Sequence, residues 1–287
     1  MDDRLQGALA PVTHLPFLKM HGAANDFVVF DHREAFLPEP PAALVRRLCD
    51  RRRGVGADGV LLLERDPELD FAMRYFNADG DAADFCGNGA RCLARLALDL
   101  GLGRAGEVRF RTAAGVMGAR RDERGGIALH FGAVARPGEP LEVEACGRRF
   151  TGSLIRAGVP HFVTAVERLE AVPVVEWGAA LRRHPAFGAE GANVDFVTRL
   201  GAAGVAMRTY ERGVEGETLA CGSGAIATAL WAAGTGEASP VAVRTAGGDE
   251  LRVAFRASAQ GWDVTLSGPA EVAFAGAWSE PVVAERS

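Results

Sequence analysis

The fold of this chain is decided by residues 86–100, which read CGNGARCLARLALDL. A cysteine is followed by a glycine turn and then by an apolar, alanine-rich run that predicts a buried helix. The same arrangement returns at residues 221–234, which read CGSGAIATALWAAG. Because a cysteine, Gly-x-Gly-Ala and a helical run recur in the same order, the two segments indicate that one structural unit occurs twice.

Further echoes surround these two segments. Residues 73–76 (MRYF) precede the first and residues 207–210 (MRTY) precede the second, while residues 111–115 (RTAAG) are answered by residues 244–248 (RTAGG). All of these echoes lie 133 to 135 residues apart. Matches that keep both their order and their spacing predict two similar halves, related by a gene duplication and a pseudo-twofold axis.

Each half is predicted to consist mostly of strands with one long helix. Apolar runs rich in β-branched and aromatic residues predict strands, at 26–31, 60–64, 71–76 and 108–111 in the first half, and at 162–166, 194–198, 206–212, 241–245, 251–256 and 262–266 in the second. Helices are predicted at 41–53, 89–100, 176–183 and 224–233. This pattern indicates an α+β fold of two pseudo-symmetric domains, each a curved, mainly antiparallel sheet wrapped around a central helix.

The order of the elements also suggests domain boundaries. We expect residues 1–15 to form an N-terminal extension, residues 16–134 the first half and residues 135–268 the second half. The two halves would then join in the glycine- and proline-rich stretch at residues 132–140.

Composition limits the classes of protein to which the chain can belong. With 287 residues, 48% hydrophobic and 24% charged, it has the makeup of an ordinary soluble globular protein. A net charge of -5 argues against a nucleic-acid partner. No signal peptide or long apolar span is visible, so we expect a cytoplasmic protein without a membrane partner. The six histidines have no metal-ligand spacing, and no metal site is predicted.

The counts of lysine and cysteine exclude further chemistry. Lys19 is the only lysine, so a pyridoxal phosphate enzyme would have a single candidate for its Schiff base. Five cysteines are an odd number without the spacing of a disulfide framework, which fits reduced thiols. Cys49, Cys92 and Cys146 have no matched partner in the repeat and are interpreted as structural.

Cys86 and Cys221 are the candidates for catalysis. A thiol at the start of a helix meets unpaired backbone N–H groups and the positive end of the helix dipole, which favours its thiolate. Two helix starts that face each other would bind a carboxylate between two thiols. Such a pair can invert an amino-acid α-carbon, because one sulfur removes a proton from one face and the other supplies a proton to the opposite face.

The motifs as a set resemble the diaminopimelate epimerase family over residues 17–275. Beside the two cysteine segments, the resemblance rests on the stretches KMHG (19–22), NDF (25–27), FNADG (76–80), NVDF (193–196), YERG (210–213) and ETLACGSG (217–224). It implies two pseudo-symmetric domains with the active site between them. It also implies that the last strand, from residue 269, returns to the first strand, so that residues 269–287 would belong to the first half.

The resemblance implies an activity as well. Members interconvert LL- and meso-2,6-diaminopimelate for lysine and peptidoglycan synthesis, are cytoplasmic, need no cofactor and are often homodimers. Cys86 and Cys221 would be the acid and base. The residues expected to contact substrate are Asn25, Asn77, Gly87, Asn88, Asn193, Glu211, Arg212, Gly222 and Ser223, and those expected to tune the pKa of the thiols are His161 and Glu211.

Two departures from the family pattern concern the distal end of the substrate. Val159 stands where an asparagine ligand is common, and the segment GADG at residues 56–59 has glycine where some members place a glutamine. Two alternatives therefore stay open. One is a related cofactor-independent racemase of another amino acid, such as proline or histidine, and the other is a non-catalytic binding protein on the same fold.

Overall fold

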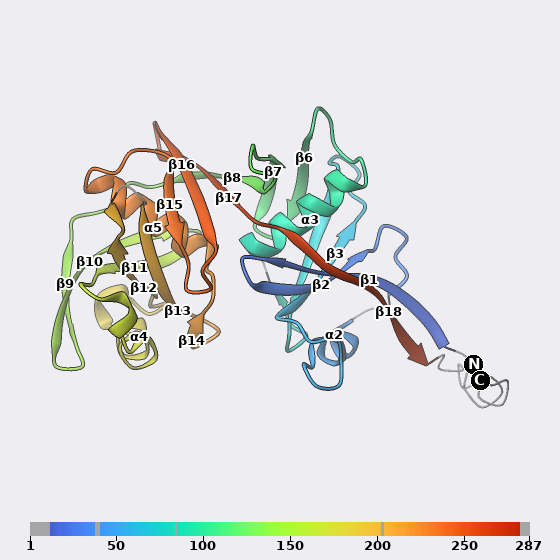
Figure 1. Cartoon of the computed structure of the whole chain (residues 1–287), viewed down its shortest axis with the longest axis horizontal. Coiled ribbons are helices and arrows are strands. Elements are labelled where there is room, and N and C mark those ends of the chain that lie inside the picture. The colour runs from blue at the N-terminus through green and yellow to red at the C-terminus, as the bar shows by residue number, and fades with distance from the viewer. Residues whose placement is uncertain (1–11, 38–40, 84, 202–203, 282–287) are drawn as a thin grey trace.

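The computed structural model describes residues 12–37, 41–83, 85–201 and 204–281. Two lobes lie side by side along the long axis of the molecule, one for each half of the sequence (Figure 1). Strands predominate and each lobe contains one long central helix, which confirms the predicted α+β fold. Among the residues described, no helix is both long and apolar enough to cross a membrane.

The first lobe is a curved sheet with strands in the spatial order β1-β2-β3-β4-β6-β7-β8. Only the pairs β2–β3 and β4–β6 are parallel. The strands are β1 (Val12–Gly22), β2 (Asn25–Asp31), β3 (Gly59–Glu64), β4 (Phe71–Asn77), β5 (Ala82–Ala83), β6 (Glu107–Thr112), β7 (Gly115–Arg121) and β8 (Ile127–Val134). Its helices are α2 (Ala42–Cys49) and α3 (Gly87–Asp99).

The second lobe repeats this arrangement with strands in the order β9-β10-β11-β12-β13-β15-β16-β17. The strands are β9 (Leu141–Ala145), β10 (Arg148–Ala157), β11 (Val159–Ala165), β12 (Asn193–Arg199), β13 (Val205–Glu211), β14 (Gly216–Thr218), β15 (Val241–Arg244), β16 (Glu250–Ser258) and β17 (Gly261–Gly268). Its helices are α4 (Val174–Arg182) and α5 (Gly222–Gly234), with short 3₁₀ turns at η1 (Leu169–Ala171) and η2 (Pro185–Phe187).

Each lobe encloses its long helix in an apolar core. Around α3 the core contains Leu93 and the stacked rings of Phe71 and Phe110, whose centroids are 4.6 Å apart. Around α5 it contains Ile226 and Leu230. The helices α2 and α4 belong to two separate cores in their respective lobes. Strands surround α3 and α5, which explains why the sequences of both helices are apolar.

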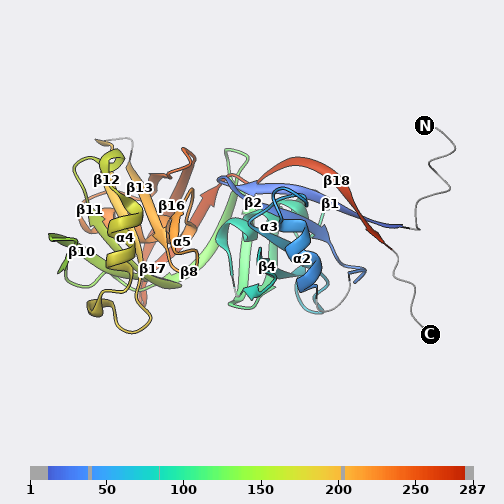
Figure 2. The same cartoon turned by 90° about the horizontal axis from the view of Figure 1, so that it is seen from below.

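The lobes are joined by pairing between equivalent strands. β8 and β17 run antiparallel, with Leu129 opposite Leu266, so one continuous sheet passes from the first lobe to the second. The last strand, β18 (Glu271–Pro281), leaves the second lobe and pairs with β1 along its length (Figures 1 and 2). This pairing supports a division in which the strand from residue 269 belongs with residues 16–134, and we propose that division for the domains.

The predicted N-terminal extension, residues 1–15, is wrong for its last four residues. β1 begins at Val12 and pairs with β18 from there, so residues 12–15 belong to the sheet rather than to an extension. Residues 1–11 lie outside the described residues. No strand was predicted over the residues of β1, β7, β8, β9 and β10. The exposed positions of β7, β9 and β10 carry charged and small residues instead of a continuous apolar run.

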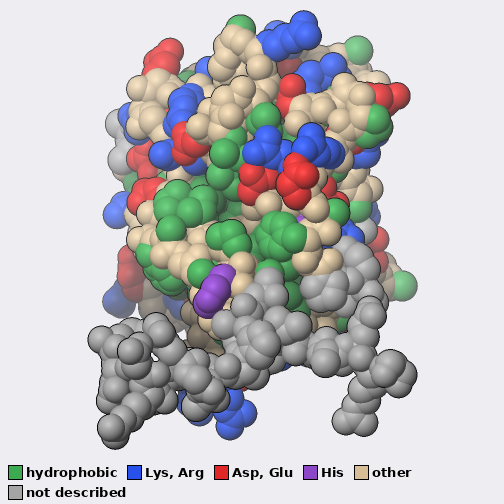
Figure 3. All heavy atoms as spheres, turned by 90° about the vertical axis from the view of Figure 1, so that its right-hand side faces the viewer, with side chains coloured by type: hydrophobic (Ala, Val, Ile, Leu, Met, Phe, Trp, Pro, Cys, Tyr) green, Lys and Arg blue, Asp and Glu red, His purple; other side chains and the backbone are tan. Residues whose placement is uncertain are grey.

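The end of the molecule formed by β1 and β18 has exposed apolar side chains. Figure 3 shows them next to side chains of both charges. Phe36 and Phe274 are 39% and 49% exposed. Ring contacts at 6.1 to 6.3 Å connect these two residues through Phe30 and Phe17, so they belong to one aromatic cluster.

Candidate functional site

Cys86 and Cys221 occupy equivalent positions at the starts of the two long helices. Each is the extended residue immediately before a helix, with φ and ψ of -140° and 115° at Cys86 and of -121° and 113° at Cys221. A Cβ atom at Gly87 would lie 3.9 Å from Leu266 Cδ2, and one at Gly222 would lie 3.2 Å from the same atom. Both helix starts therefore face the side chain of Leu266, which lies at the joint between the lobes where β17 pairs with β8.

A direct hydrogen bond also crosses between the lobes at this point. The side-chain amide of Asn88, in the first turn of α3, donates to the carbonyl of Ala220 at 3.3 Å. Ala220 is the residue before Cys221, so the backbone that carries the second thiol is held by the helix that follows the first. The fold thus brings together the two helix starts that contain Cys86, Gly87, Asn88, Cys221, Gly222 and Ser223.

In the first lobe a chain of hydrogen bonds leads from Arg91 to the neighbourhood of Cys86. The buried Arg91 guanidinium donates to Asn88 Oδ1 at 2.9 Å, and Asn88 Nδ2 donates to Asn25 Oδ1 at 3.1 Å. The Cys86 thiol donates to the same Asn25 oxygen at 3.5 Å. Asn25 Nδ2 in turn donates to Asp58 Oδ2 at 2.8 Å, so Asp58 keeps the amide oxygen of Asn25 turned toward the thiol.

A second chain serves Cys221 in the other lobe. The backbone N–H of Arg212 donates to Asn193 Oδ1 at 2.6 Å, and Asn193 Nδ2 lies 3.2 Å from His161 Nε2. The opposite ring nitrogen of His161 lies 2.8 Å from Asp195 Oδ2, and these two side chains have no exposed surface.

Ser223 connects this chain to the thiol. Its hydroxyl lies 3.0 Å from His161 Nε2 and 3.5 Å from Cys221 Sγ. It therefore stands between the imidazole and the sulfur, in the first turn of α5. The Asn25 side chain occupies the corresponding place beside Cys86, where it contacts both Asn88 and the thiol.

Glu211 and Asn77 close equivalent strands, β13 and β4. The Glu211 carboxylate accepts a hydrogen bond from the Thr218 hydroxyl at 2.9 Å. Burial raises the pKa of Glu211, and that bond partly opposes the rise. The charge of Glu211 also raises the pKa of both Cys86 and Cys221, which places this carboxylate within electrostatic reach of both thiols. Asn77 is the last residue of β4, and its carbonyl accepts a hydrogen bond at 2.9 Å from the N–H of Gly80 in the turn that follows.

The surroundings of the two thiols favour the protonated form over the thiolate, contrary to the expectation from the helix dipoles. Burial raises the pKa of Cys86 to about 11, and the backbone N–H groups of Gly89 and Asn88 offset only part of that rise. Burial also raises the pKa of Cys221 well above its usual range, and Glu211 and Asp195 add to the effect. Desolvation of the charged form outweighs the helix terminus.

The two positions that depart from the family pattern, Gly59 and Val159, have different structural surroundings. A side chain at Gly59 would place its Cβ 2.7 Å from Tyr75 Cε2 and 2.5 Å from the Phe76 carbonyl, so this position accommodates only glycine unless both the ring and the backbone of β4 move. Val159 is half-buried at the start of β11, where it pairs with Ala157. Its side chain cannot replace the hydrogen bond of an asparagine at that place.

The sequence analysis missed two carboxylates that support this site. Asp195 was part of the NVDF stretch but received no role, and Asp58 was considered only within GADG. The available signal for Asp195 was an acidic residue in the middle of an otherwise apolar strand, which requires a buried partner.

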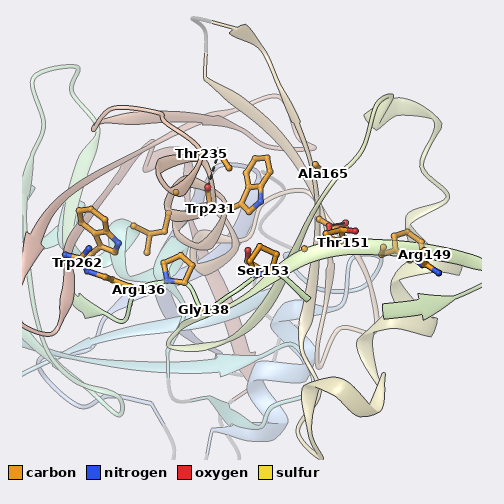
Figure 4. A pocket seen from close by; sticks show the side chains of 16 residues that line it. Arg136, Gly138, Arg149, Thr151, Ser153, Ala165, Trp231, Thr235 and Trp262 are labelled. Carbon is orange, nitrogen blue, oxygen red and sulfur yellow. Dashed lines mark hydrogen bonds between the residues drawn. The ribbon is translucent and has the colours of Figure 1, made fainter. Parts of the chain in front are cut away.

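A cavity away from the two thiols lies in the second lobe. It has a volume of about 740 Å³ and is lined by the connection between β8 and β9, by β10 and by the C-terminal part of α5 (Figure 4). Trp231 and Thr235 line it, whereas Cys221 precedes the other end of that helix. At about 1.5 Å of rise per residue, these two residues lie about 15 and 20 Å along the helix from Cys221.

The raised pKa values predict slow alkylation of the site thiols. When the protein is treated with iodoacetamide near pH 7, mass spectrometry should find Cys146, which is exposed, modified first. Modification of Cys86 should accelerate with pH up to about 11, since only the thiolate reacts. Labelling of Cys86 as fast as Cys146 at neutral pH would show that burial does not control this thiol.

Comparison with known proteins identifies the family. The family model for diaminopimelate epimerase matches residues 17–136 and 153–269. Diaminopimelate epimerase from Aquifex aeolicus is 40% identical over 281 residues, covering 94% of this chain and 99% of the relative. Among solved structures, a phenazine biosynthesis protein of the PhzF family from Enterococcus faecalis (15% identity, TM-score 0.70, covering 93% of this chain and 99% of the other) shares the fold. So does a hydroxyproline epimerase from Agrobacterium vitis (19% identity, TM-score 0.65, covering 93% of each chain). The sequence matches extend over nearly the whole molecule, and the chain belongs to the diaminopimelate epimerase family.

Proposed function

We propose that this protein is a diaminopimelate epimerase that interconverts LL- and meso-2,6-diaminopimelate with two thiols and no cofactor. Membership of the family supports the substrate. The observation that carries the mechanism is the matched pair of cysteines, each immediately before a long helix and each followed by a glycine that lies next to Leu266 at the joint of the lobes. No other pair of thiols among the described cysteines has this symmetry.

In this mechanism the reacting carboxylate binds between the two helix starts. The backbone N–H groups of Gly87, Asn88, Gly222 and Ser223 are available there, because the first turn of a helix has no internal acceptors for them. They stabilise the negative charge that develops when the α-proton leaves. Cys86 and Cys221 act from opposite faces and exchange the roles of acid and base when the direction of reaction reverses.

The raised pKa values suit this chemistry. An α-proton of an amino acid is a very weak acid, and a thiolate with a high pKa is a stronger base toward it than an ordinary thiolate. The opposite thiol stays protonated and can supply the proton to the other face. Glu211 is placed to receive the substrate's ammonium group and, with His161, to influence the ionisation of the thiols.

Recognition of the remaining substrate groups is assigned to side chains around the thiols. Asn25 and Asn193 belong to the hydrogen-bond chains that reach the sulfur atoms, and Asn77 stands at the end of β4. Arg212 offers a guanidinium that can bind the distal carboxylate in a bidentate manner. In this state it lies 3.5 Å from the Glu190 carboxylate, which the substrate would have to displace.

The nearest alternative is a racemase of another amino acid on the same fold. The hydroxyproline epimerase from Agrobacterium vitis has this fold, but its 19% identity carries no information about substrate. A pure binding protein would have no need for two thiols at equivalent helix starts. Family membership and the thiol pair together favour epimerisation of diaminopimelate.

A single exchange experiment separates these possibilities. Purified protein incubated with LL-diaminopimelate in heavy water, without added cofactor, should yield the meso isomer with deuterium at one α-carbon. Proton NMR and mass spectrometry measure both changes. Exchange on proline or histidine without exchange on diaminopimelate would contradict the substrate assignment, and no exchange on any of the three would favour a binding protein.

Replacement of either thiol tests the two-base mechanism. Cys86→Ala and Cys221→Ala should each abolish epimerisation, because each direction of reaction needs both an acid and a base. The matched control is Cys146→Ala, which removes an exposed thiol and should leave the rate unchanged. A single variant at position 86 or 221 with full activity would refute the mechanism.

We also infer a cytoplasmic homodimer without a membrane or nucleic-acid partner. The exposed aromatic cluster that contains Phe36 and Phe274 offers an apolar surface for a second copy. Sedimentation equilibrium at micromolar concentration should give twice the chain mass of 30.2 kDa. A species at the mass of one chain would contradict the dimer.

A further inference from the structure

Two buried side chains beside the second thiol, His161 and Asp195, form a pair that the proposed reaction does not by itself require. Both are fully buried, and His161 Nδ1 lies 2.8 Å from Asp195 Oδ2. The other oxygen of Asp195 accepts a hydrogen bond from the Thr209 hydroxyl at 2.7 Å. A carboxylate with no exposed surface is costly unless hydrogen bonds or an opposite charge compensate it, so the partners of Asp195 determine its state.

The neighbouring hydrogen bonds determine which nitrogen of His161 carries the proton. The backbone N–H of Arg212 can only donate, so the Asn193 atom that it contacts at 2.6 Å is the oxygen. The Asn193 amide therefore presents its NH₂ group to His161 Nε2, which must accept. In the neutral ring the proton then sits on Nδ1 and is donated to Asp195.

We propose that Asp195 is a positioning residue that holds His161 in the Nδ1–H tautomer, so that Nε2 stays unprotonated and can act as a base toward Ser223 and Cys221. This inference rests on the two-thiol function proposed above. Ser223 lies between Nε2 and the Cys221 sulfur, at 3.0 Å and 3.5 Å. As the Cys221 S–H bond breaks, its proton passes to Ser223 Oγ while the serine proton passes to Nε2, and the imidazolium that forms is paired with Asp195.

In the first lobe a carboxylate also orients the side chain that contacts the thiol, but that side chain cannot take up a proton. Asp58 orients Asn25 in the way that Asp195 orients His161, and Asn25 then meets Asn88 and Cys86. An amide cannot take up a proton, however, whereas an imidazole can. Cys221 is therefore the thiol that is coupled to a proton acceptor through its hydrogen bonds, and Cys86 is held only by a neutral acceptor.

Nitrogen-15 NMR of the histidine rings tests the tautomer directly. The full-length protein labelled at histidine has six rings, and the His161→Gln variant identifies the signals of His161. The wild type, without substrate, should show a protonated Nδ1 and an unprotonated Nε2 at neutral pH. A wild-type ring protonated at Nε2 alone would overturn the proposal, and this measurement needs no variant at Asp195.

The variant Asp195→Asn should raise the fraction of His161 rings protonated at Nε2, because the Thr209 hydroxyl holds the amide oxygen and turns toward Nδ1 an NH₂ group that cannot accept the Nδ1 proton. The Asn193 NH₂ group, which faces Nε2, opposes this shift. The kcat of the variant should fall by about 10²-fold with little change in KM, the size expected for the loss of an acid–base group. The matched control is Thr209→Val, which removes the other hydrogen bond of Asp195 and should keep the Nδ1–H tautomer. Unchanged ring signals in Asp195→Asn would contradict the proposal.

The two readouts separate this inference from the proposed function. If the wild type has the Nδ1–H tautomer but does not exchange diaminopimelate, the positioning role stands and the substrate assignment fails. If the wild type epimerises diaminopimelate with His161 protonated at Nε2, the function stands and the role of Asp195 is refuted. A structural role alone would lower stability without moving the proton between the ring nitrogens.

Discussion

The antiparallel pairing of β8 with β17 is the contact on which the rest of this molecule depends. It joins two copies of one sheet edge to edge, with Leu129 opposite Leu266. Because each sheet encloses its own helix, joining the sheets also brings the two helix starts against Leu266. The two thiols, the free N–H groups and the hydrogen bond from Asn88 to Ala220 all meet at this joint.

The duplicated scaffold is symmetric, but the side chains on it are not. Asn25 in the first lobe and His161 in the second both contact the thiol region, and Asn77 and Glu211 both end equivalent strands. In both pairs the residue of the second lobe, His161 or Glu211, can ionise, whereas the asparagine of the first lobe cannot. In the proposed mechanism, this symmetric fold would place two sulfur atoms on opposite faces of one carbon and give the two directions of proton transfer different neighbours.

Burial and the helix termini act against each other at the thiols. The N–H groups at each helix start favour a thiolate, but removal of the sulfur from water costs more, and the pKa of each thiol rises. Substrate would bring an ammonium and a carboxylate into this space and alter that balance. In the proposed mechanism the same dry surroundings would strengthen the hydrogen bonds that stabilise a carbanion, so the high pKa values and that stabilisation would have one physical origin.

Much of this protein was determined by its sequence alone. The repeated Cys-Gly-x-Gly-Ala segments predicted the duplication, the two central helices and the paired thiols, since a glycine turn followed by an apolar run is a local signal. The predicted helices began within about two residues of those observed, an error that is normal for helix ends. The strands β7, β9 and β10 were missed because their exposed faces carry charged or small residues, and only pairing with neighbours makes them strands.

Tertiary structure decided what the thiols experience. The local pattern at Cys86 and Cys221 indicated an easily ionised sulfur, whereas packing against the other lobe excludes water and reverses the direction of the pKa shift. The partners Asp58 and Asp195 lie 33 to 34 residues from Asn25 and His161 in the chain, so no local pattern could connect them. Burial and hydrogen bonding between distant segments are properties of the folded chain, and the sequence pattern determined only which groups would be available for them.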